Sequence, residues 1–434
     1  MQRHSVLYRE LVRFIYNLVF KRKTLGYCIR ILASKMGIVY IKMAQILAMQ
    51  DIKGVFTDKD RQDIADIVDS VNLIPVKTIK RIIEANYKES PFREINCSPL
   101  GSASVSQVHE AYLKSGEHVV LKVKRPQIED NIQKDIIQVR KLVKALGFVF
   151  GIRNIKASNK ALRLLESWIH QEINFENEAY NIQRFAEFAD SVNTKSNRIE
   201  VPKLYREYCT QQIIVMEYIP YENIKSGNYA NEQIICSINA YVKLSFAALF
   251  KGLPVVFHGD PHFGNVYITR DNNIGFLDLG LIFELSPEES QQIKHLFLCA
   301  WFRNVKELQR VLRPWFYGNY KQWGMFCNNL QEYCDTMQNR PLSHYFMDVL
   351  QFCLRAKVCP PDYLFKAAKA FACLGGYDDI FLQSETGYKL LEDEVVHYLI
   401  KSGKREFLNL CRNVIHKDYV KIYNQIISIT ELKI

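Results

Sequence analysis

The chain has 434 residues, which at ~150 residues per domain corresponds to roughly three domains. Hydrophobic residues make up 48% of it and charged residues 24%, a composition that excludes a disordered chain. Lysine and arginine outnumber aspartate and glutamate by 57 to 46, which suits phosphate-bearing ligands, anionic membranes or nucleic acid. Because no basic cluster is interleaved with aromatic residues, nucleic acid is not expected as a partner.

The cysteine spacing and the hydropathy indicate a cytosol-like compartment. None of the eleven cysteines forms a C-x-x-C motif, which favours reduced, mostly buried thiols. No stretch reaches ~18 consecutive apolar residues, and the N-terminus does not resemble a secretory signal. We therefore expect a cytoplasmic protein without a transmembrane helix, with peripheral membrane association left open.

Residues 1–90 carry helical periodicity and form the first predicted domain. The first two dozen residues predict a basic, amphipathic helix, which either lies on an anionic membrane or docks on its own domain; docking is favoured. The apolar positions near one face of this helix are Leu7, Leu11, Ile15, Leu18 and Val19. Further along, Lys42 lies in the apolar run GIVYIKMAQILAM at 37–49, and periodicity alone favours a solvent-facing lysine there.

Residues 91–218 form the second predicted domain, which opens with turn residues and continues as a hairpin. Pro91, Pro99 and Gly101 predict a loop before the first strand. Alternating runs at 104–113 and 118–124 then predict two strands joined by a tight turn at 114–117. The second run contains Lys122, a charge that is costly among apolar neighbours unless it has a partner.

Acidic and small residues around this hairpin are candidates for a nucleotide site. The segment QEINFENEA at 171–179 predicts a helix carrying Glu172, Glu176 and Glu178, which either pair with lysines or form a solvated face. The small residues Gly101, Ser102, Ala103 and Ser104 would let backbone N–H groups approach phosphates, and would equally make an ordinary turn. We also assign Glu217, in IIVMEYIP at 213–220, to the cofactor site.

The strongest signal lies in the third predicted domain, residues 219–434, where HGDPHFGN at 258–265 precedes FLDLG at 276–280. Phosphoryl transfer needs a carboxylate beside the attacking group, together with oxygen ligands that hold Mg²⁺ against the phosphates. Asp260, Asn265 and Asp278 supply such groups in the order found in kinases. A polar surface turn is the alternative, and it does not require this ordered set.

Together these motifs resemble the UbiB-like, AarF-domain atypical kinase family associated with ubiquinone biosynthesis. The resemblance extends from about residue 30 to 290 and implies an α+β, protein-kinase-like two-lobed fold with an N-terminal helical extension over the active site. It rests on five segments in the family's order: IKMAQ, PLGSASVSQVH, VVLKVKRP, QEINFENEA and HGDPHFGN with LDLG.

The resemblance also implies roles for individual residues in an ATP- and Mg²⁺-dependent site. Lys122 would contact the ATP phosphates and pair with Glu178, and Lys42 would pair with Glu172. Asp260 would be the catalytic carboxylate, with Asn265 and Asp278 as Mg²⁺ ligands. The sequence departs from the family pattern at Ala44, Gly101, Ser102, Asn174 and Leu279.

These observations favour an ATP-binding, Mg²⁺-dependent atypical kinase or ATPase that supports isoprenoid-quinone metabolism near membranes. A small-molecule phosphotransferase of the aminoglycoside or choline kinase type is the first alternative, because HGDPHFGN suits those enzymes equally well. A non-catalytic nucleotide- or lipid-binding scaffold is the second, and the full set of predicted ligand residues argues against it.

Overall fold

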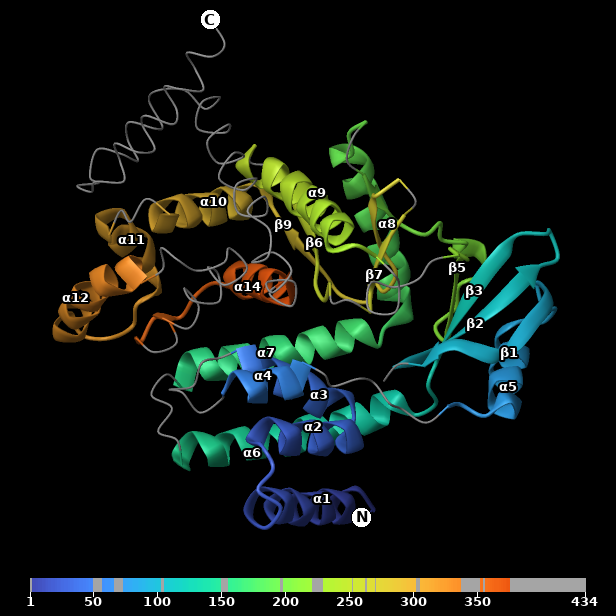
Figure 1. The fold of residues 1–434 in the computed structure, drawn as a ribbon, viewed down its shortest axis with the longest axis horizontal. Helices are drawn as coiled ribbons and strands as arrows, with labels where there is room; N and C mark the ends of the chain where they lie inside the picture. Colours follow the sequence, from blue (N-terminus) through green and yellow to red (C-terminus); the bar gives the residue numbers. More distant parts are fainter. Residues whose placement is uncertain are drawn as a thin grey trace, which may run out of the picture. The chain divides into compact units, whose positions relative to one another are not determined.

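The computed structural model divides the chain into two compact units, which we describe one at a time (Figure 1). The first unit comprises residues 1–184, 201–220 and 278–281, and the second comprises 185–200, 221–277 and 282–434. The structure describes residues 2–374, except for 50–56, 66–72, 103–104, 150–154, 196–197, 221–228, 252, 262–263, 270, 302–304, 337–351 and 354–355.

The first unit begins with helices, as predicted. They are α1 (Gln2–Val19), α2 (Leu25–Met36), α3 (Ile38–Met49), α4 (Asp58–Ala65) and α5 (Val76–Asn86). The hydroxyl of Thr24 caps α2 by accepting a hydrogen bond from the Tyr27 N–H at 3.1 Å. Gly37, at φ +106°, then separates α2 from α3, because a left-handed backbone there suits glycine.

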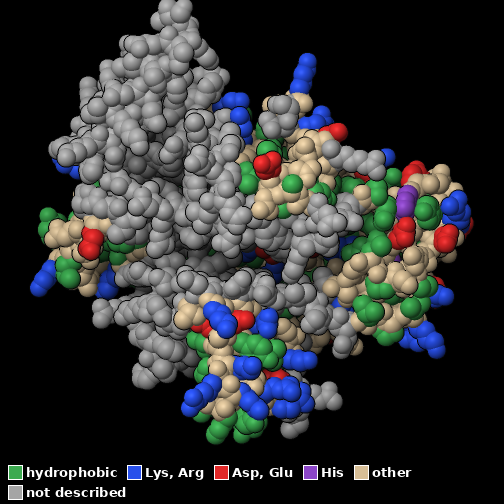
Figure 2. Space-filling view, in the orientation of Figure 1, with side chains coloured by type: hydrophobic (Ala, Val, Ile, Leu, Met, Phe, Trp, Pro, Cys, Tyr) green, Lys and Arg blue, Asp and Glu red, His purple; other side chains and the backbone are tan. Residues whose placement is uncertain are grey.

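Helix α1 contacts α2 but leaves an apolar face in solvent. The favoured interpretation, a helix docked on its own domain, therefore holds for only one side of α1, where Glu10 is buried. Figure 2 shows apolar and basic side chains gathered over this helix. We call the exposed apolar residues the α1 face: Tyr8, Val12, Ile15, Tyr16, Leu18, Val19 and Phe20.

A four-stranded antiparallel sheet follows, in the order β1-β2-β3-β5. Its strands are β1 (Phe92–Ser102), β2 (Ser106–Leu113), β3 (His118–Lys124) and β5 (Ile213–Glu217). The predicted hairpin is confirmed as β2–β3, with Gly116 at φ +109° in its turn. The loop predicted before it is wrong, because 92–102 pairs with β2 as an edge strand. Register shifts between Ile95, Pro99 and Gly101 accommodate the proline.

Helix α5 packs on one face of this sheet and closes a hydrophobic core. Its inward residues Ile79 and Ile83 lie four apart, so they share one face of the helix. They contact the alternate, inward-facing residues of β3 and β5. The buried members of this core include Phe92, Leu113, Val119, Leu121, Val123, Ile213 and Val215. Lys122 thus lies on the most buried part of the sheet, facing away from α5.

Three helices complete the first unit and lead into the second: α6 (Ile128–Val149), α7 (Ile155–Glu172) and α8 (Phe175–Val192). Helix α3 packs against α6 and α7. The acidic segment 171–179, predicted as one helix, is divided between two. The chain breaks at Asn174, whose side-chain oxygen accepts hydrogen bonds from the N–H groups of Glu176 and Asn177. Asn174 therefore caps α8, which separates Glu172 from Glu178.

The second unit holds two small sheets and most of the remaining helices. The three-stranded sheet has the order β4-β8-β7, and the two-stranded sheet pairs β6 with β9. A short 3-10 helix, Arg206–Tyr208, precedes β5 in the first unit, and a second lies at Arg313–Trp315. The second unit's strands and helices are β4 (Ile199–Glu200), α9 (Asn231–Phe250), β6 (Val255–His258), β7 (Val266–Ile268), β8 (Ile274–Phe276), β9 (Ile282–Leu285), α10 (Pro287–Trp301), α11 (Val305–Leu312), α12 (Tyr320–Thr336) and α14 (Asp362–Leu374).

The predicted start of α10 is confirmed by a reciprocal cap. The Ser286 hydroxyl accepts from the Glu289 N–H at 3.2 Å, and the Glu289 carboxylate accepts from the Ser286 N–H at 2.9 Å. Among the described residues, no helix is both long and apolar enough to span a bilayer.

Candidate functional site

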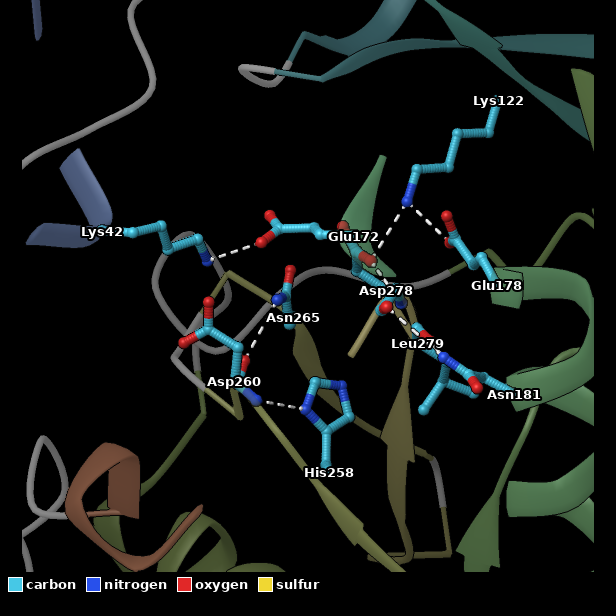
Figure 3. A network of polar contacts seen from close by, with 11 residues as sticks. Lys42, Lys122, Glu172, Glu178, Asn181, His258, Asp260, Asn265, Asp278 and Leu279 are labelled. Atoms are coloured by element: carbon cyan, nitrogen blue, oxygen red, sulfur yellow. Dashed lines mark hydrogen bonds and ion pairs between the residues drawn. The ribbon is translucent and has the colours of Figure 1, made fainter. Parts of the chain in front are cut away.

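Lys122 is the centre of a buried charge cluster in the first unit (Figure 3). Its Nζ lies 2.6 Å from Glu178 Oε1 on α8 and 3.1 Å from Asp278 Oδ1. The Glu178 side chain is fully buried, whereas that of Asp278 is 36% exposed. The strand lysine therefore has the partner that its apolar surroundings require, and the carboxylate of Asp278 remains accessible from solvent.

Burial and mutual attraction shift the pKa values of this cluster. Burial raises the pKa of Glu178 to about 7, against the attraction of Lys122, and the negative charge of Asp278 adds to the rise. Burial alone would lower the pKa of Lys122, but the carboxylates of Asp278 and Glu178 raise it above its ordinary value. Lys122 therefore stays charged at neutral pH, while Glu178 titrates close to it.

The segment 278–280 is held in place by hydrogen bonds within the first unit. Asp278 Oδ1 accepts from the Gly280 N–H at 3.0 Å. The buried Asn181 donates its side-chain N–H to the carbonyl of Leu279 at 2.9 Å and to that of Gly280 at 3.3 Å. A Cβ on Gly280 would lie 3.1 Å from Asp278 Oδ1, so glycine permits this close approach. The sequence motifs do not single out Asn181; the available signal is its position three residues after Glu178, on the same face of α8.

Lys42 forms an ion pair with Glu172 in the first unit, at 3.3 Å (Figure 3). Their side chains are only 12% and 18% exposed, so the prediction from periodicity that Lys42 faces solvent is wrong. Periodicity describes one helix and cannot show that α7 brings a carboxylate to α3. The contact implied by the family resemblance is present. Ala44, which stands at the signature glycine, is buried on α3.

A second polar cluster lies in the second unit, in the loop that follows β6 (Figure 3). The Asp260 N–H donates to His258 Nδ1 at 3.0 Å, and the Asn265 side-chain N–H donates to the Asp260 carbonyl at 3.1 Å. The buried ring of His258 stacks on Phe276 and meets Phe185 edge to face. His258, which the sequence analysis did not assign, thus anchors the backbone of Asp260 to an aromatic core.

A lysine far along the chain also reaches this loop. Lys369 on α14 donates to the Gly259 carbonyl at 2.7 Å, and its Nζ lies 3.5 Å from Asp260 Oδ1. The sequence motifs do not single out Lys369 either. The available signal was a single charge inside the apolar stretch AAKAFA, because a lysine there needs a partner if it is buried.

The other predicted site residues lie around the sheet of the first unit. Gly101 and Ser102 end β1, where the Ser102 hydroxyl accepts from Arg125 at 2.6 Å. A Cβ on Gly101 would meet no atom within 4 Å, so packing does not require glycine there. Ala103 and Ser104 lie outside the described residues. Glu217 ends β5 with an exposed side chain, which accepts from the Lys203 N–H at 3.2 Å.

The residues expected to hold Mg²⁺ have suitable chemistry. Mg²⁺ prefers oxygen ligands and keeps several waters, so two protein ligands together with phosphate oxygens suffice. Asp278 offers an accessible carboxylate. The side-chain nitrogen of Asn265 donates to the Asp260 carbonyl, so the side-chain oxygen is the atom with which Asn265 would coordinate a cation. Within the described part of the chain, no cluster of three or more His, Cys, Asp or Glu residues suggests a different metal centre.

Comparison with known proteins identifies the family. The model of the ABC1 atypical kinase-like domain matches residues 66–312, more than half of the chain. The chain belongs to the ABC1 atypical kinase-like family. This membership confirms the resemblance to UbiB-like proteins. Together with the mixed helices and sheets of the structure, it also confirms the expected α+β, protein-kinase-like fold.

Curated relatives of this ABC1 protein are named probable protein kinase UbiB. One from Shewanella sp. strain MR-7 is 30% identical over 336 residues, which cover 74% of this chain and 59% of that protein. The relative from Shewanella oneidensis shows the same identity and coverage. The chain thus spans less than two thirds of the length of these relatives.

Solved structures resemble this ABC1 protein more distantly. The Rv3197–erythromycin complex from Mycobacterium tuberculosis is 18% identical, with a TM-score of 0.47 over 70% of this chain and 80% of that one. The ADP-bound aminoglycoside phosphotransferase APH(2'')-Ib is 11% identical, with a TM-score of 0.25 over 65% of this chain and 99% of that one.

Proposed function

We propose that this ABC1 protein binds ATP with Mg²⁺ and acts as an atypical kinase or ATPase. The observation that carries the proposal is the buried Lys122, which contacts both Glu178 and Asp278. Burying the two ionisable groups Lys122 and Glu178 is costly for stability, and a nucleotide site is a physical reason to keep them. Kinases use such a strand lysine and helix glutamate to hold the α- and β-phosphates.

The remaining site residues take roles around the same nucleotide in this proposal. Asn265 and Asp278 hold Mg²⁺, which would neutralise charge on the phosphates when bound. In support, Leu277, the residue before Asp278, donates its backbone N–H to the Asn265 carbonyl at 3.1 Å. Asp260 is the catalytic carboxylate, and the Lys42–Glu172 pair belongs to the catalytic set. The segment 101–104 and Glu217 contribute to nucleotide binding.

For the biological role we propose support of isoprenoid-quinone metabolism, including ubiquinone biosynthesis. The support is family membership together with relatives that carry the name UbiB. A quinone precursor or related lipid is the corresponding partner.

The decisive test of the enzyme proposal is ATP turnover by the purified chain with and without Mg²⁺. Asp278→Asn and Lys122→Met should each lower turnover by ~10²-fold or more, since each removes an electrostatic contact to the phosphates. Lys114→Met is the matched control, because Lys114 lies in the exposed β2–β3 turn, where its ion pair with Glu89 is open to solvent. Tight ATP binding with zero turnover would favour the scaffold alternative, and phosphorylation of aminoglycosides or choline would favour the small-molecule kinase.

We further propose that the protein works at an anionic membrane surface through α1. Tyr8 and Phe20, at opposite ends of the α1 face, are each 73% exposed. Large apolar side chains exposed together on one helix mark an interaction surface. Arg9 and Arg13 are largely exposed on the same helix, and Lys21, Arg22 and Lys23 follow it. This combination is typical of helices that lie in a lipid interface.

Flotation with phosphatidylglycerol-containing vesicles tests this surface. Ile15→Ser combined with Val19→Ser should lower binding by ~10-fold or more, because each buried apolar side chain contributes ~1.5 kcal/mol or more. Leu73→Ser is the control, since Leu73 is equally exposed outside α1. Binding that is unchanged by the double substitution would exclude the α1 face.

A further inference from the structure

Lys369 is a charged residue at a buried position, where an apolar residue is expected. It lies on α14 between Ala368 and Ala370, both of which are buried, and its own side chain is only 9% exposed. An ammonium group is costly to bury unless it is paired, whereas a methionine of similar length would fill the same space without that cost. The charge at this position therefore needs an explanation beyond packing.

The contacts of Lys369 lie on the loop that carries Asp260. Its Nζ donates to the Gly259 carbonyl at 2.7 Å and lies 3.5 Å from Asp260 Oδ1. The hydrogen bond to the Gly259 carbonyl fixes the position of the ammonium group. It therefore also keeps the ammonium group beside the Asp260 carboxylate. The Asp260 side chain is itself only 13% exposed, so solvent screens this attraction little.

Two further hydrogen bonds hold the backbone of Asp260. His258 Nδ1 accepts from the Asp260 N–H, and the Asn265 side chain donates to the Asp260 carbonyl. These two bonds set the path of the chain at Asp260. Lys369 contacts a carboxylate oxygen, and so restrains the side chain of Asp260 as well as the neighbouring Gly259 carbonyl.

We propose that Lys369 is a positioning residue that holds the Asp260 carboxylate in a fixed orientation. This inference rests on the proposed role of Asp260 as the catalytic carboxylate. It extends the site to α14, more than a hundred residues beyond the loop. Because Lys369 acts through Asp260, its loss should slow turnover without weakening the binding of ATP, which the proposed function assigns to Lys122.

The test compares Lys369→Met and Lys369→Arg with Lys366→Met, a control on the same helix at a partly exposed lysine. Lys369→Met should lower kcat by about 10²-fold, since small misplacements of a catalytic group cost that much. The KM for ATP and the rise in melting temperature with ATP and Mg²⁺ should not change. Lys369→Arg keeps the charge and should recover most of kcat, and Lys366→Met should match the wild type.

Hydrogen exchange of the amides at 258–265 provides a second readout that does not need turnover. We expect faster exchange there in Lys369→Met than in wild type, with no change in Lys366→Met. An unchanged kcat in Lys369→Met overturns the inference, as does a lower kcat accompanied by a lower melting temperature that Lys369→Arg does not restore. If the wild type shows no turnover, the proposed function fails. The hydrogen exchange of Lys369→Met is then the only test of the contact between Lys369 and the loop. Unchanged exchange then overturns the inference, and faster exchange upholds the contact.

Discussion

At the scale of single residues, the cluster around Lys122 has one cation between two carboxylates, and one of those is fully buried. Such groups depend on each other. Removing one partner of a buried pair leaves an uncompensated charge, whereas replacing both by neutral groups of similar shape is often tolerated. The stability of variants and its dependence on pH therefore test the cluster without any ligand.

Lys122→Met should lower the free energy of unfolding by about 3–5 kcal/mol, because Glu178 is then buried without its cation. The double variant Lys122→Met with Glu178→Gln should recover part of this loss, since neither remaining group is charged. Urea denaturation of the two single variants and the double variant gives the coupling energy. A double variant as unstable as the sum of the singles would contradict the buried pair.

Glu178 should also make stability depend on pH. Its folded-state pKa of about 7 lies above the ordinary value of 4.5, so the folded protein binds more protons than the unfolded chain between these values. The contribution of Glu178 to the free energy of unfolding therefore falls as pH rises from about 4.5 to about 7, and is constant above. Glu178→Gln should lose this slope in melting experiments across that range. A slope equal to that of wild type would contradict the raised pKa.

At the scale of elements, the break between α7 and α8 brings the two glutamates to different lysines. Glu172 ends α7 and pairs with Lys42, whereas Glu178 lies in the first turn of α8 and pairs with Lys122. Asn174 creates this break, because its side-chain oxygen satisfies N–H groups that the start of α8 would leave unpaired. Asn174, which stands where the family has aspartate, is therefore a helix cap. An aspartate at this position could cap α8 in the same way.

Asn174→Ala should lower the free energy of unfolding by about 1 kcal/mol, the usual cost of losing a helix cap. Asn174→Asp keeps the acceptor oxygen and should remain close to wild type. Gln183→Ala, at an exposed position within α8, should change stability by less than about 0.5 kcal/mol. Chemical denaturation of the three variants distinguishes these outcomes, and an Asn174→Ala protein as stable as the control would contradict the cap.

At the scale of the whole molecule, a ligand that binds only the folded chain stabilises it by mass action. ATP with Mg²⁺ at a hundred times its dissociation constant should add about 2.7 kcal/mol to the free energy of unfolding. Asp278→Asn should keep the stabilisation by ATP alone and lose the further increase caused by Mg²⁺. Calorimetry with ATP, with Mg²⁺ and with both measures the two contributions. No stabilisation of wild type by the pair would contradict the nucleotide site.

Sequence patterns predicted what local chemistry determines. Gly116 marked the β2–β3 turn, and Ser286 with Glu289 marked the start of α10. They did not predict β1, because its turn-forming residues are held in a strand by pairing with β2. Nor did they predict the partners of Lys42 and Lys369, since both depend on which elements the tertiary fold brings together.

The ion pair between Lys42 and Glu172 also bears on how the protein is made. Helix α3 leaves the ribosome long before α7, so its lysine has no carboxylate to meet until the chain has been extended through residue 172. At ~5–20 residues per second this delay is on the order of ten seconds. For most of that interval the apolar surface of α3 is without α6, and throughout it α7 is incomplete, so nascent chains stalled before residue 172 should be the ones that chaperones retain.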